Sequence, residues 1–353
     1  MKITLKLRQD YKSVSFRTNK NGIQEILKMA DNAPFLVINP HAEDKRLGKK
    51  TEKILAAAKE TFGDFGYDMT TKIGDGIPIA KKAVEEGYKT LVAIGGDGTL
   101  NELVNVAATT DIKVGMFPGG SACDSHKTHG VPKDFNRAFE IISEAYYERF
   151  PVGLAKGDTD RYFIEMINGG FIGETSASLA DRFEWAHGEV GYAYAAIRIA
   201  LKYKLIPSKI TIDNEIIREA NISALAISLT DCISDFDYIP GNHLRLGDFA
   251  IIIVKDVKRL GLVRLLLQAI NGKHVKRDNV EILRGKHVLI ESETPHIWEI
   301  EGEIPSKKTT RMEVKYLPDA ISLIIPKGWK YGITKKEKQD GRKRVLKGLQ
   351  PFV

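Results

Sequence analysis

Residues 35 to 117 alternate short apolar runs with segments of helical periodicity, and this alternation limits the folds open to the chain. Four of the runs are strand-sized: Phe35–Ile38, Tyr67–Thr71, Thr90–Ile94 and Val114–Phe117. The segments between them carry apolar residues at helical spacing, and two of them end at glycines, Gly63 and Gly87. Strands that alternate with helices predict a mainly parallel sheet. We therefore predict an α/β domain over residues 35–150.

After Phe150 the pattern of apolar residues changes to many strand-sized runs and two helical segments, 191–204 and 262–271. So many strands with so few helices predict an antiparallel, β-sandwich-like second domain over residues 151–330. The expected strands are Tyr162–Asn168, Lys209–Asp213, Ile222–Leu229, Asp248–Val254, His287–Ser292, Ile297–Glu301, Arg311–Lys315 and Ile321–Ile325.

The two ends of the chain stand outside these domains. Residues 1–34 alternate apolar and polar side chains in two short stretches, and they predict a β-hairpin followed by a helix over 23–30. Residues 331–353 form a basic C-terminal tail, with seven lysines and arginines from Lys335 to Lys347. Three roles stay open for the tail: a solvated end, a segment that contacts a membrane surface, or a helix packed on the α/β domain.

The net charge of +7 favours polyanionic partners such as nucleotide phosphates, nucleic acid or an anionic bilayer. No nucleic-acid motif accompanies the charge, so we expect no nucleic-acid partner. The sequence has no apolar run long enough to span a bilayer and no signal-peptide pattern at its start. Cys123 and Cys232 lie far apart and suit a reducing cytosol. We expect a cytoplasmic protein, with peripheral contact at the inner face of the membrane.

The most informative segment is Gly95-Gly96-Asp97-Gly98-Thr99, directly after a buried run. Its glycines let the backbone approach a bulky anion, and a helix expected to start at Thr99 directs its positive end to the same place. Asp97 would repel phosphate unless it binds Mg²⁺ or accepts a proton from an attacking hydroxyl. The alternative is a plain strand-to-helix turn, in which Thr99 and Glu102 form a capping box.

The full string from Gly95 to Glu102, followed by Val104-Asn105, resembles the nucleotide loop of the diacylglycerol kinase-like lipid kinases, relatives of sphingosine kinases and bacterial lipid kinases. NAD kinases and phosphofructokinases share the shorter Gly-Gly-Asp-Gly. Further landmarks follow in the family's order over residues 35–330: Asn39-Pro40, Thr70 or Thr71 before Gly74-Asp75, Pro118–Asp124, Gly130-Val131-Pro132, Asn168-Gly169, Pro240 with Gly247, Gly272-Lys273-His274 and Glu301-Gly302-Glu303.

The resemblance implies a kinase that binds ATP and Mg²⁺ between its two domains and phosphorylates a hydroxyl of a membrane lipid. It implies two catalytic carboxylates: Asp97, which also meets the metal of Mg-ATP, and Glu303, which accepts the hydroxyl proton. The residues expected at the nucleotide are Asn39, Thr70, Gly95, Gly96, Asp97, Gly98, Thr99, Asn101, Glu102, Gly120, Ser121 and Asp124. A homodimeric assembly stays open.

Several positions depart from the family pattern. His41-Ala42-Glu43 stands where the family has a Ser-Gly pair, Cys123 replaces an asparagine, and Glu301 replaces an aspartate. Near Pro240 the family carries an Asp-Gly pair that serves a bound magnesium ion. Here the segment reads Leu246-Gly247-Asp248, which leaves Asp248 as the candidate ligand. The lipid is not identified, since glycerolipids, sphingoid bases and isoprenoid alcohols all offer a hydroxyl.

Two other functions stay open on the sequence. An NAD kinase shares the Gly-Gly-Asp-Gly loop and a sandwich domain, but its Thr-Gly-Ser-Thr-Ala-Tyr-like segment is missing from residues 151–330. A non-catalytic relative that binds nucleotide or nucleic acid would explain the changes at His41-Ala42-Glu43 and Leu246. Against it, the chain keeps a complete set of chemically useful side chains: Asp97, Thr99, Asp124 and Glu303.

Overall fold

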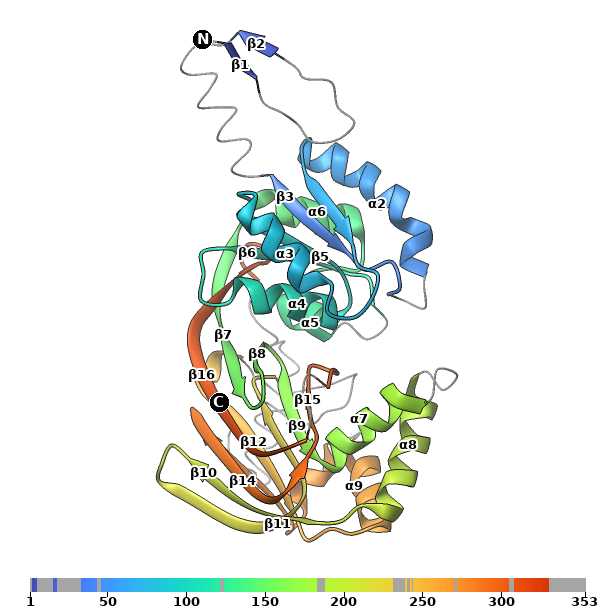
Figure 1. Ribbon diagram of the computed structural model, residues 1–353, viewed down its shortest axis with the longest axis vertical. Coiled ribbons are helices and arrows are strands. Elements are labelled where there is room, and N and C mark those ends of the chain that lie inside the picture. The colour runs from blue at the N-terminus through green and yellow to red at the C-terminus, as the bar shows by residue number, and fades with distance from the viewer. Residues whose placement is uncertain are drawn as a thin grey trace.

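Four parallel strands form the sheet of the first domain in the computed structural model, in the order β6-β5-β3-β4 (Figure 1). They are β3 (Pro34–Ile38), β4 (Gly66–Met69), β5 (Thr90–Gly95) and β6 (Lys113–Pro118). Strands β3, β5 and β6 are almost wholly buried, because each is an apolar run covered on both faces. The parallel pairing predicted from the alternation is confirmed.

Helices cover both faces of this sheet. They are α2 (Arg46–Phe62), α3 (Gly76–Glu85), α4 (Asp97–Ala107), α5 (Asp124–His129) and α6 (Phe135–Glu144). Helix α2 packs against α6, and α3 packs against α4. The rings of Phe62 and Phe139 lie 5.2 Å apart at the α2–α6 contact. Two helix pairs on opposite faces of a parallel sheet are the expected result of right-handed crossovers.

The second domain is an antiparallel sandwich, as predicted. Its strands are β7 (Tyr147–Lys156), β8 (Asp160–Phe163), β9 (Met166–Gly170), β10 (Ile206–Ile212), β11 (Ile216–Ser228), β12 (Phe249–Lys255), β13 (Val280–Gly285), β14 (His287–His296), β15 (Trp298–Ile300) and β16 (Thr309–Ile324). Strand β11 pairs with β10 along its first half and with β9 along its second half. This change of partner lets the sheet fold over and enclose a core around Phe163, Phe249 and Trp298.

Three helices cover the outer face of β11 and β12 in the described part of the second domain. They are α7 (Phe171–Arg182), α8 (Gly188–Lys202) and α9 (Leu260–Ala269), and short 3-10 turns occur at Leu244–Leu246 and Lys273–Lys276. A separate core lies beneath them and includes Phe171, Ala200, Ile252 and Leu262. Helix α8 and helix α9 confirm the helical segments predicted near 191–204 and 262–271, whereas α7 and the strands β7 and β13 were not predicted.

Strands β7 and β16 run through both domains, so the chain crosses the domain boundary twice (Figure 1). They pair antiparallel from Glu313↔Lys156 to Ile324↔Tyr147, with a register shift between Leu317 and Ile321. The far end of β16 then joins the first sheet by parallel pairing with β6 at Lys113 and Val114. The boundary expected near Phe150 therefore falls inside a strand, and the end of the chain's last strand belongs to the first domain.

The structure describes residues 2–4, 15–17, 33–42, 46–120, 124–182, 188–230, 239, 242, 244–269, 272–304 and 308–329. The hairpin expected near the start is present as β1 (Lys2–Thr4) and β2 (Ser15–Arg17), which pair antiparallel. The helix expected over 23–30 and the basic tail 331–353 lie outside the described residues. No helix in the described ranges is both long and apolar enough to cross a membrane.

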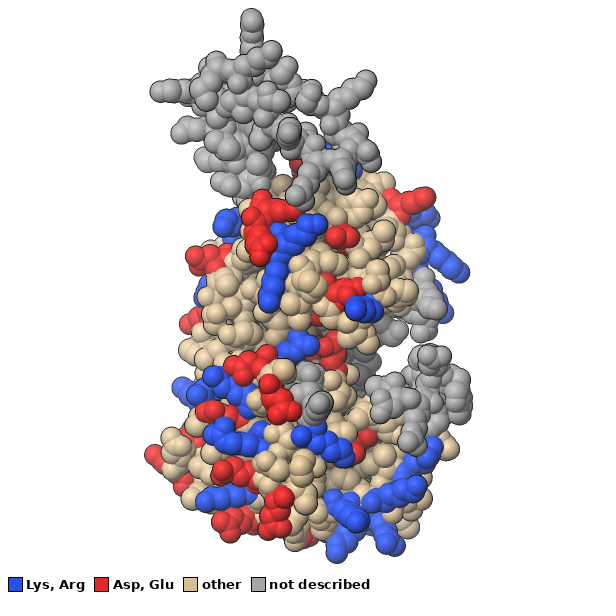
Figure 2. Space-filling view, in the orientation of Figure 1, with Lys and Arg blue, Asp and Glu red and all other residues tan. Residues whose placement is uncertain are grey.

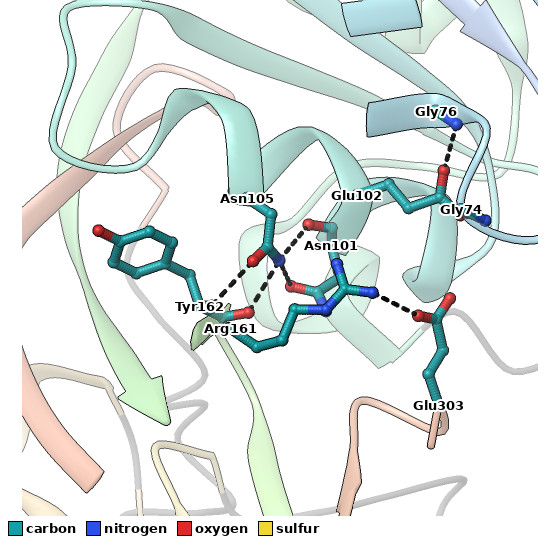
Figure 3. Close-up of polar contacts among 8 residues, drawn as sticks. All are labelled: Gly74, Gly76, Asn101, Glu102, Asn105, Arg161, Tyr162 and Glu303. Carbon is teal, nitrogen blue, oxygen red and sulfur yellow. Dashed lines mark hydrogen bonds and ion pairs between the residues drawn. The ribbon is translucent and has the colours of Figure 1, made fainter. Parts of the chain in front are cut away.

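Asn105 on α4 ties the first domain to β8 of the second domain (Figure 3). Its side-chain amide donates to the backbone oxygen of Tyr162 at 3.0 Å and accepts from the backbone nitrogen of Tyr162 at 2.9 Å. The same amide also donates to the backbone oxygen of Asn101 at 2.9 Å. An asparagine amide matches a backbone amide in this way because it carries both a donor and an acceptor.

We predict that Asn105→Ala weakens the junction between the domains. The substitution leaves both polar backbone groups of Tyr162 without their partner, which should lower the free energy of unfolding by about 2 kcal/mol. Chemical denaturation measures this loss, and Asn136→Ala, at an exposed position on α6, is the matched control. Equal stability of the two variants would show that Asn105 does not hold the domains together.

Candidate active site

The predicted nucleotide residues gather at the carboxyl ends of the parallel strands. Asn39 follows β3, Thr70 follows β4, Gly95 ends β5, and Gly120 lies just beyond β6. Backbone hydrogen bonds hold these loops together, since Gly119 N donates to Gly95 O at 2.8 Å and Thr70 N donates to Ile38 O at 2.9 Å. In open α/β sheets this end of the strands is where ligands bind.

The glycine loop is compact because its side chains are absent. A Cβ on Gly95 would lie 2.4 Å from the Thr99 hydroxyl oxygen, and one on Gly96 would lie 3.6 Å from the Cα of Gly120. Asn39 Nδ2 donates to the same Thr99 oxygen at 3.3 Å, which ties the loop after β3 to the loop after β5. Close packing against Thr99 therefore requires a glycine at position 95, and no glycine of the loop has a positive φ.

Helix α4 begins at Asp97, two residues before the expected Thr99, with Gly96 as its N-cap. The capping box between Thr99 and Glu102 is therefore wrong, since no side chain caps α4. Asp97 stands in the first turn, where the positive end of the helix favours a carboxylate. The backbone N–H groups of this turn and the Asp97 carboxylate share one end of the helix.

Glu102 caps a different helix from the one it belongs to (Figure 3). Its buried carboxylate accepts from Gly74 N at 2.9 Å and from Gly76 N at 2.5 Å, at the start of α3. Burial raises the pKa of Glu102, and these two hydrogen bonds oppose the rise. The side chain therefore fixes α3 against α4. Asn101, also buried, accepts from Asn105 Nδ2 at 3.1 Å.

Glu303 of the second domain lies against the glycine loop of the first. A Cβ on Gly98 would stand 3.5 Å from Glu303 Oε1, an ordinary van der Waals distance, so Glu303 lies directly beside the loop. The carboxylate also pairs with Arg161 Nη2 at 3.7 Å (Figure 3). Burial and the Glu102 carboxylate raise the pKa of Glu303, while Arg161 lowers it. Glu303 follows a tight turn after β15 and pairs back to Ile300 as an isolated bridge.

Asp97 is connected to the second domain through Ser125. The backbone N–H of Ser125 donates to Asp97 Oδ1 at 3.2 Å, and its hydroxyl donates to Glu165 Oε1 at 2.6 Å. Both Ser125 and Glu165 are buried. Sequence reasoning missed this pair, because neither residue lies in a glycine-rich motif and they are far apart in the chain.

Glu301 is a half-buried residue at the junction of the domains, with its carboxylate turned inward. Its Oε1 accepts from the backbone nitrogens of Ile164 at 2.7 Å and Glu165 at 2.6 Å. Its Oε2 is closed to solvent and has no hydrogen-bond partner among the described residues. Burial raises the pKa of Glu301 to about 8, and the carboxylates of Asp97 and Glu299 add to the rise. The raised pKa favours the protonated form of this side chain.

The described structure does not place three of the predicted site residues with the other residues of the candidate active site. Ser121 lies outside the described residues, and Asp124 begins α5 with a side chain that is also outside them. Asp248 accepts from Arg284 Nε at 2.9 Å and forms an ion pair with the same guanidinium. A guanidinium already balances the Asp248 charge, so this arrangement gives no support to Asp248 as a metal ligand.

The fold and the site together define a two-domain kinase, with a glycine loop in an α/β domain and acidic side chains supplied by a β-sandwich. Two family models match the two domains. Residues 34–155 match the diacylglycerol kinase catalytic domain, and residues 168–325 match the YegS C-terminal NAD kinase beta sandwich-like domain.

The curated relatives agree with these matches. A diacylglycerol kinase of Staphylococcus saprophyticus is 27% identical over 277 residues, which cover 77% of this chain and 89% of the relative. A diacylglycerol kinase of Staphylococcus epidermidis is 29% identical over 277 residues, covering 77% and 86%. The chain therefore belongs to the diacylglycerol kinase-like family, and it is a kinase.

Solved structures share the same fold. A diacylglycerol kinase from Bacillus anthracis str. Sterne superposes with a TM-score of 0.65 at 22% identity, covering 84% of this chain and 98% of that chain. Yeast NADH kinase complexed with NADH superposes with a TM-score of 0.52 at 11% identity, covering 89% and 87%. Both confirm the two-domain architecture.

We predict that Glu301→Gln changes how stability depends on pH. Between the ordinary pKa of 4.5 and about 8, the folded protein holds a proton on Glu301 that the unfolded chain releases. The contribution of Glu301 to the free energy of unfolding therefore decreases as pH rises through that window. Glutamine does not titrate, so the substitution removes this decrease. The melting temperature of the variant relative to the wild type should rise by several °C between pH 5 and pH 8.5.

Glu291→Gln, at an exposed position on β14, is the matched control. Its melting temperature relative to the wild type should stay constant over the same pH range. A constant difference for Glu301→Gln as well would mean that Glu301 titrates at its ordinary pKa in the folded protein.

Proposed function

We propose that this chain is an ATP-dependent lipid kinase, which transfers the γ-phosphoryl group of ATP to a hydroxyl of a membrane lipid such as diacylglycerol. The observation that carries the proposal is the approach of Glu303 to Gly98, which joins a carboxylate of the second domain to the phosphate-type loop of the first. The relatives named diacylglycerol kinase support the acceptor class.

Glu303 is proposed to accept the proton of the lipid hydroxyl as its oxygen attacks the γ-phosphorus. A carboxylate with a raised pKa is a better base than an ordinary one, and burial raises the pKa of Glu303. The ion pair with Arg161 keeps enough of the charged form available and directs the carboxylate toward the loop. The N–H groups at the start of α4 would bind the phosphate oxygens.

The Asp97 carboxylate is a suitable oxygen ligand for a magnesium ion that arrives with the nucleotide. The described residues hold no group of three side chains able to bind a metal by themselves. Mg²⁺ in kinases needs one or two carboxylates because phosphate oxygens and water complete its coordination, and Asp97 would supply one. When bound, the ion neutralises charge on the phosphate oxygens.

The acceptor can be tested directly with γ-labelled ATP and Mg²⁺. Separate reactions contain diacylglycerol in mixed micelles, a sphingoid base, NAD, or no acceptor. The NAD reaction is included because the yeast structure with the same fold is an NADH kinase. We expect label in the lipid fraction and none in NAD. Transfer to NAD alone, or to no acceptor, would contradict the proposal.

We predict that Glu303→Gln lowers lipid phosphorylation by about 10²–10⁴-fold, the usual contribution of a positioned general base. Glutamine keeps the shape of the side chain but cannot accept a proton. The Kd for ATP, measured by calorimetry, should change little. Glu215→Gln, at an exposed turn of the second domain, is the control and should leave turnover unchanged. Equal losses of turnover and ATP affinity would instead give Glu303 a role in nucleotide binding.

A further inference from the structure

Helices α8 and α9 expose apolar side chains on the surface of the second domain. Tyr194, Ile197 and Leu201 follow one another at helical spacing along α8 and are all exposed. On α9, Leu260 is 72% exposed and Leu267 is 60% exposed. The opposite sides of both helices are buried in the core beneath them, so these exposed residues form a second apolar stripe that the fold does not cover.

The charged residues that accompany these stripes are all cations. Stretch 194–204 contains Arg198, Lys202 and Lys204, and stretch 257–267 contains Lys258, Arg259 and Arg264; neither stretch contains an acid. Asp256 directly precedes the second stretch and accepts a hydrogen bond from Asn221 Nδ2 at 3.1 Å. Figure 2 shows Lys and Arg gathered at the lower right, where Figure 1 draws the ends of α8 and α9.

An open cavity of about 390 Å³ lies between the end of α8 and the start of α9. It is lined by Tyr203, Lys204, Leu205, Asn221, Lys258 and Arg259. Three cations around one cavity create a positive potential that favours an anionic group, and the neighbouring leucines favour hydrocarbon. The two preferences occur side by side on one face, which we call the α8–α9 face.

We propose that the α8–α9 face is the surface through which this protein docks on an anionic phospholipid bilayer. Leu201, Leu260 and Leu267 would enter the boundary between headgroups and acyl chains, and the cavity cations would contact phosphate headgroups. A soluble protein partner does not supply this combination of a dense anionic surface with hydrocarbon directly beneath it. The proposal concerns binding, so it can hold whether or not the lipid is phosphorylated.

The α8–α9 face is also linked to the candidate active site through helix α7. Helix α7 packs against α8 and against β15, the strand that leads to Glu301 and Glu303. Glu174 on α7 pairs with Lys308 at 2.8 Å, just after the Glu303 turn. Docking through α8 and α9 would therefore hold a lipid surface on the domain that carries Glu303.

Vesicle flotation without ATP tests the proposal. The full chain is mixed with vesicles of phosphatidylglycerol and phosphatidylcholine, or of phosphatidylcholine alone, at low salt. We expect binding to the anionic vesicles that weakens at high salt. The triple variant Lys204→Ala, Lys258→Ala, Arg259→Ala should bind about a hundredfold more weakly, since each cation near an anionic surface contributes about fivefold. Leu260→Gln with Leu267→Gln should also bind more weakly.

The matched control replaces Lys209, Lys286 and Arg311 by alanine, because these cations are exposed on strands of the same domain or, for Lys286, in the bend between β13 and β14. It should bind as the wild type does. All variants change exposed residues and should melt within about 2 °C of the wild type. If the triple variant is nevertheless unstable, the leucine pair still tests the proposal. Unchanged binding by both docking variants would overturn the proposal. Loss of binding only on truncation after Thr334 would also overturn it, in favour of the basic tail.

Discussion

The antiparallel pairing of β7 with β16 is the constraint on which the rest of the structure depends. Most two-domain chains cross between domains through a linker, whereas this chain crosses through two long strands that hydrogen-bond to each other in both domains. Because β16 also pairs with β6, the central sheet of the first domain is continuous with the sandwich of the second. The loops after β5 and β15 are therefore held at a fixed separation.

This junction brings acids of both domains together, and they are buried or half-buried there. Glu301 and Glu303 of the second domain lie near Asp97 and Glu102 of the first, and desolvation and repulsion from these carboxylates raise the pKa values of Glu301 and Glu303. Backbone N–H donors to Glu301, the Ser125 hydroxyl at Glu165, and Arg161 at Glu303 offset part of that cost. Buried acids with raised pKa values in a stable frame are typical of sites that bind cations or move protons.

The sequence was most informative where local chemistry decides structure. The run Thr90–Ile94 and the glycines after it predicted the site of the loop. Glu303 lies beside Gly98, and its catalytic role stays a prediction. The expected strands Arg311–Lys315 and Ile321–Ile325 proved to be one strand, β16. The intervening Leu317-Pro318-Asp319 resembles a turn in sequence, but the neighbouring β7 holds it as a bulge with Asp319 at φ 48°. Ser125, Glu165 and the burial of Glu301 depend on contacts between the domains, which no local pattern encodes.

The central claim is that Asp97 of the first domain and Glu303 of the second act on one phosphoryl group. A double-mutant cycle tests it most directly, with kcat of lipid phosphorylation measured for Asp97→Asn, Glu303→Gln and the double variant. Groups that act as one unit are strongly non-additive, so the double variant should lose little more activity than the worse single variant. If the two losses multiply, the residues act independently, and the account of a shared site is contradicted.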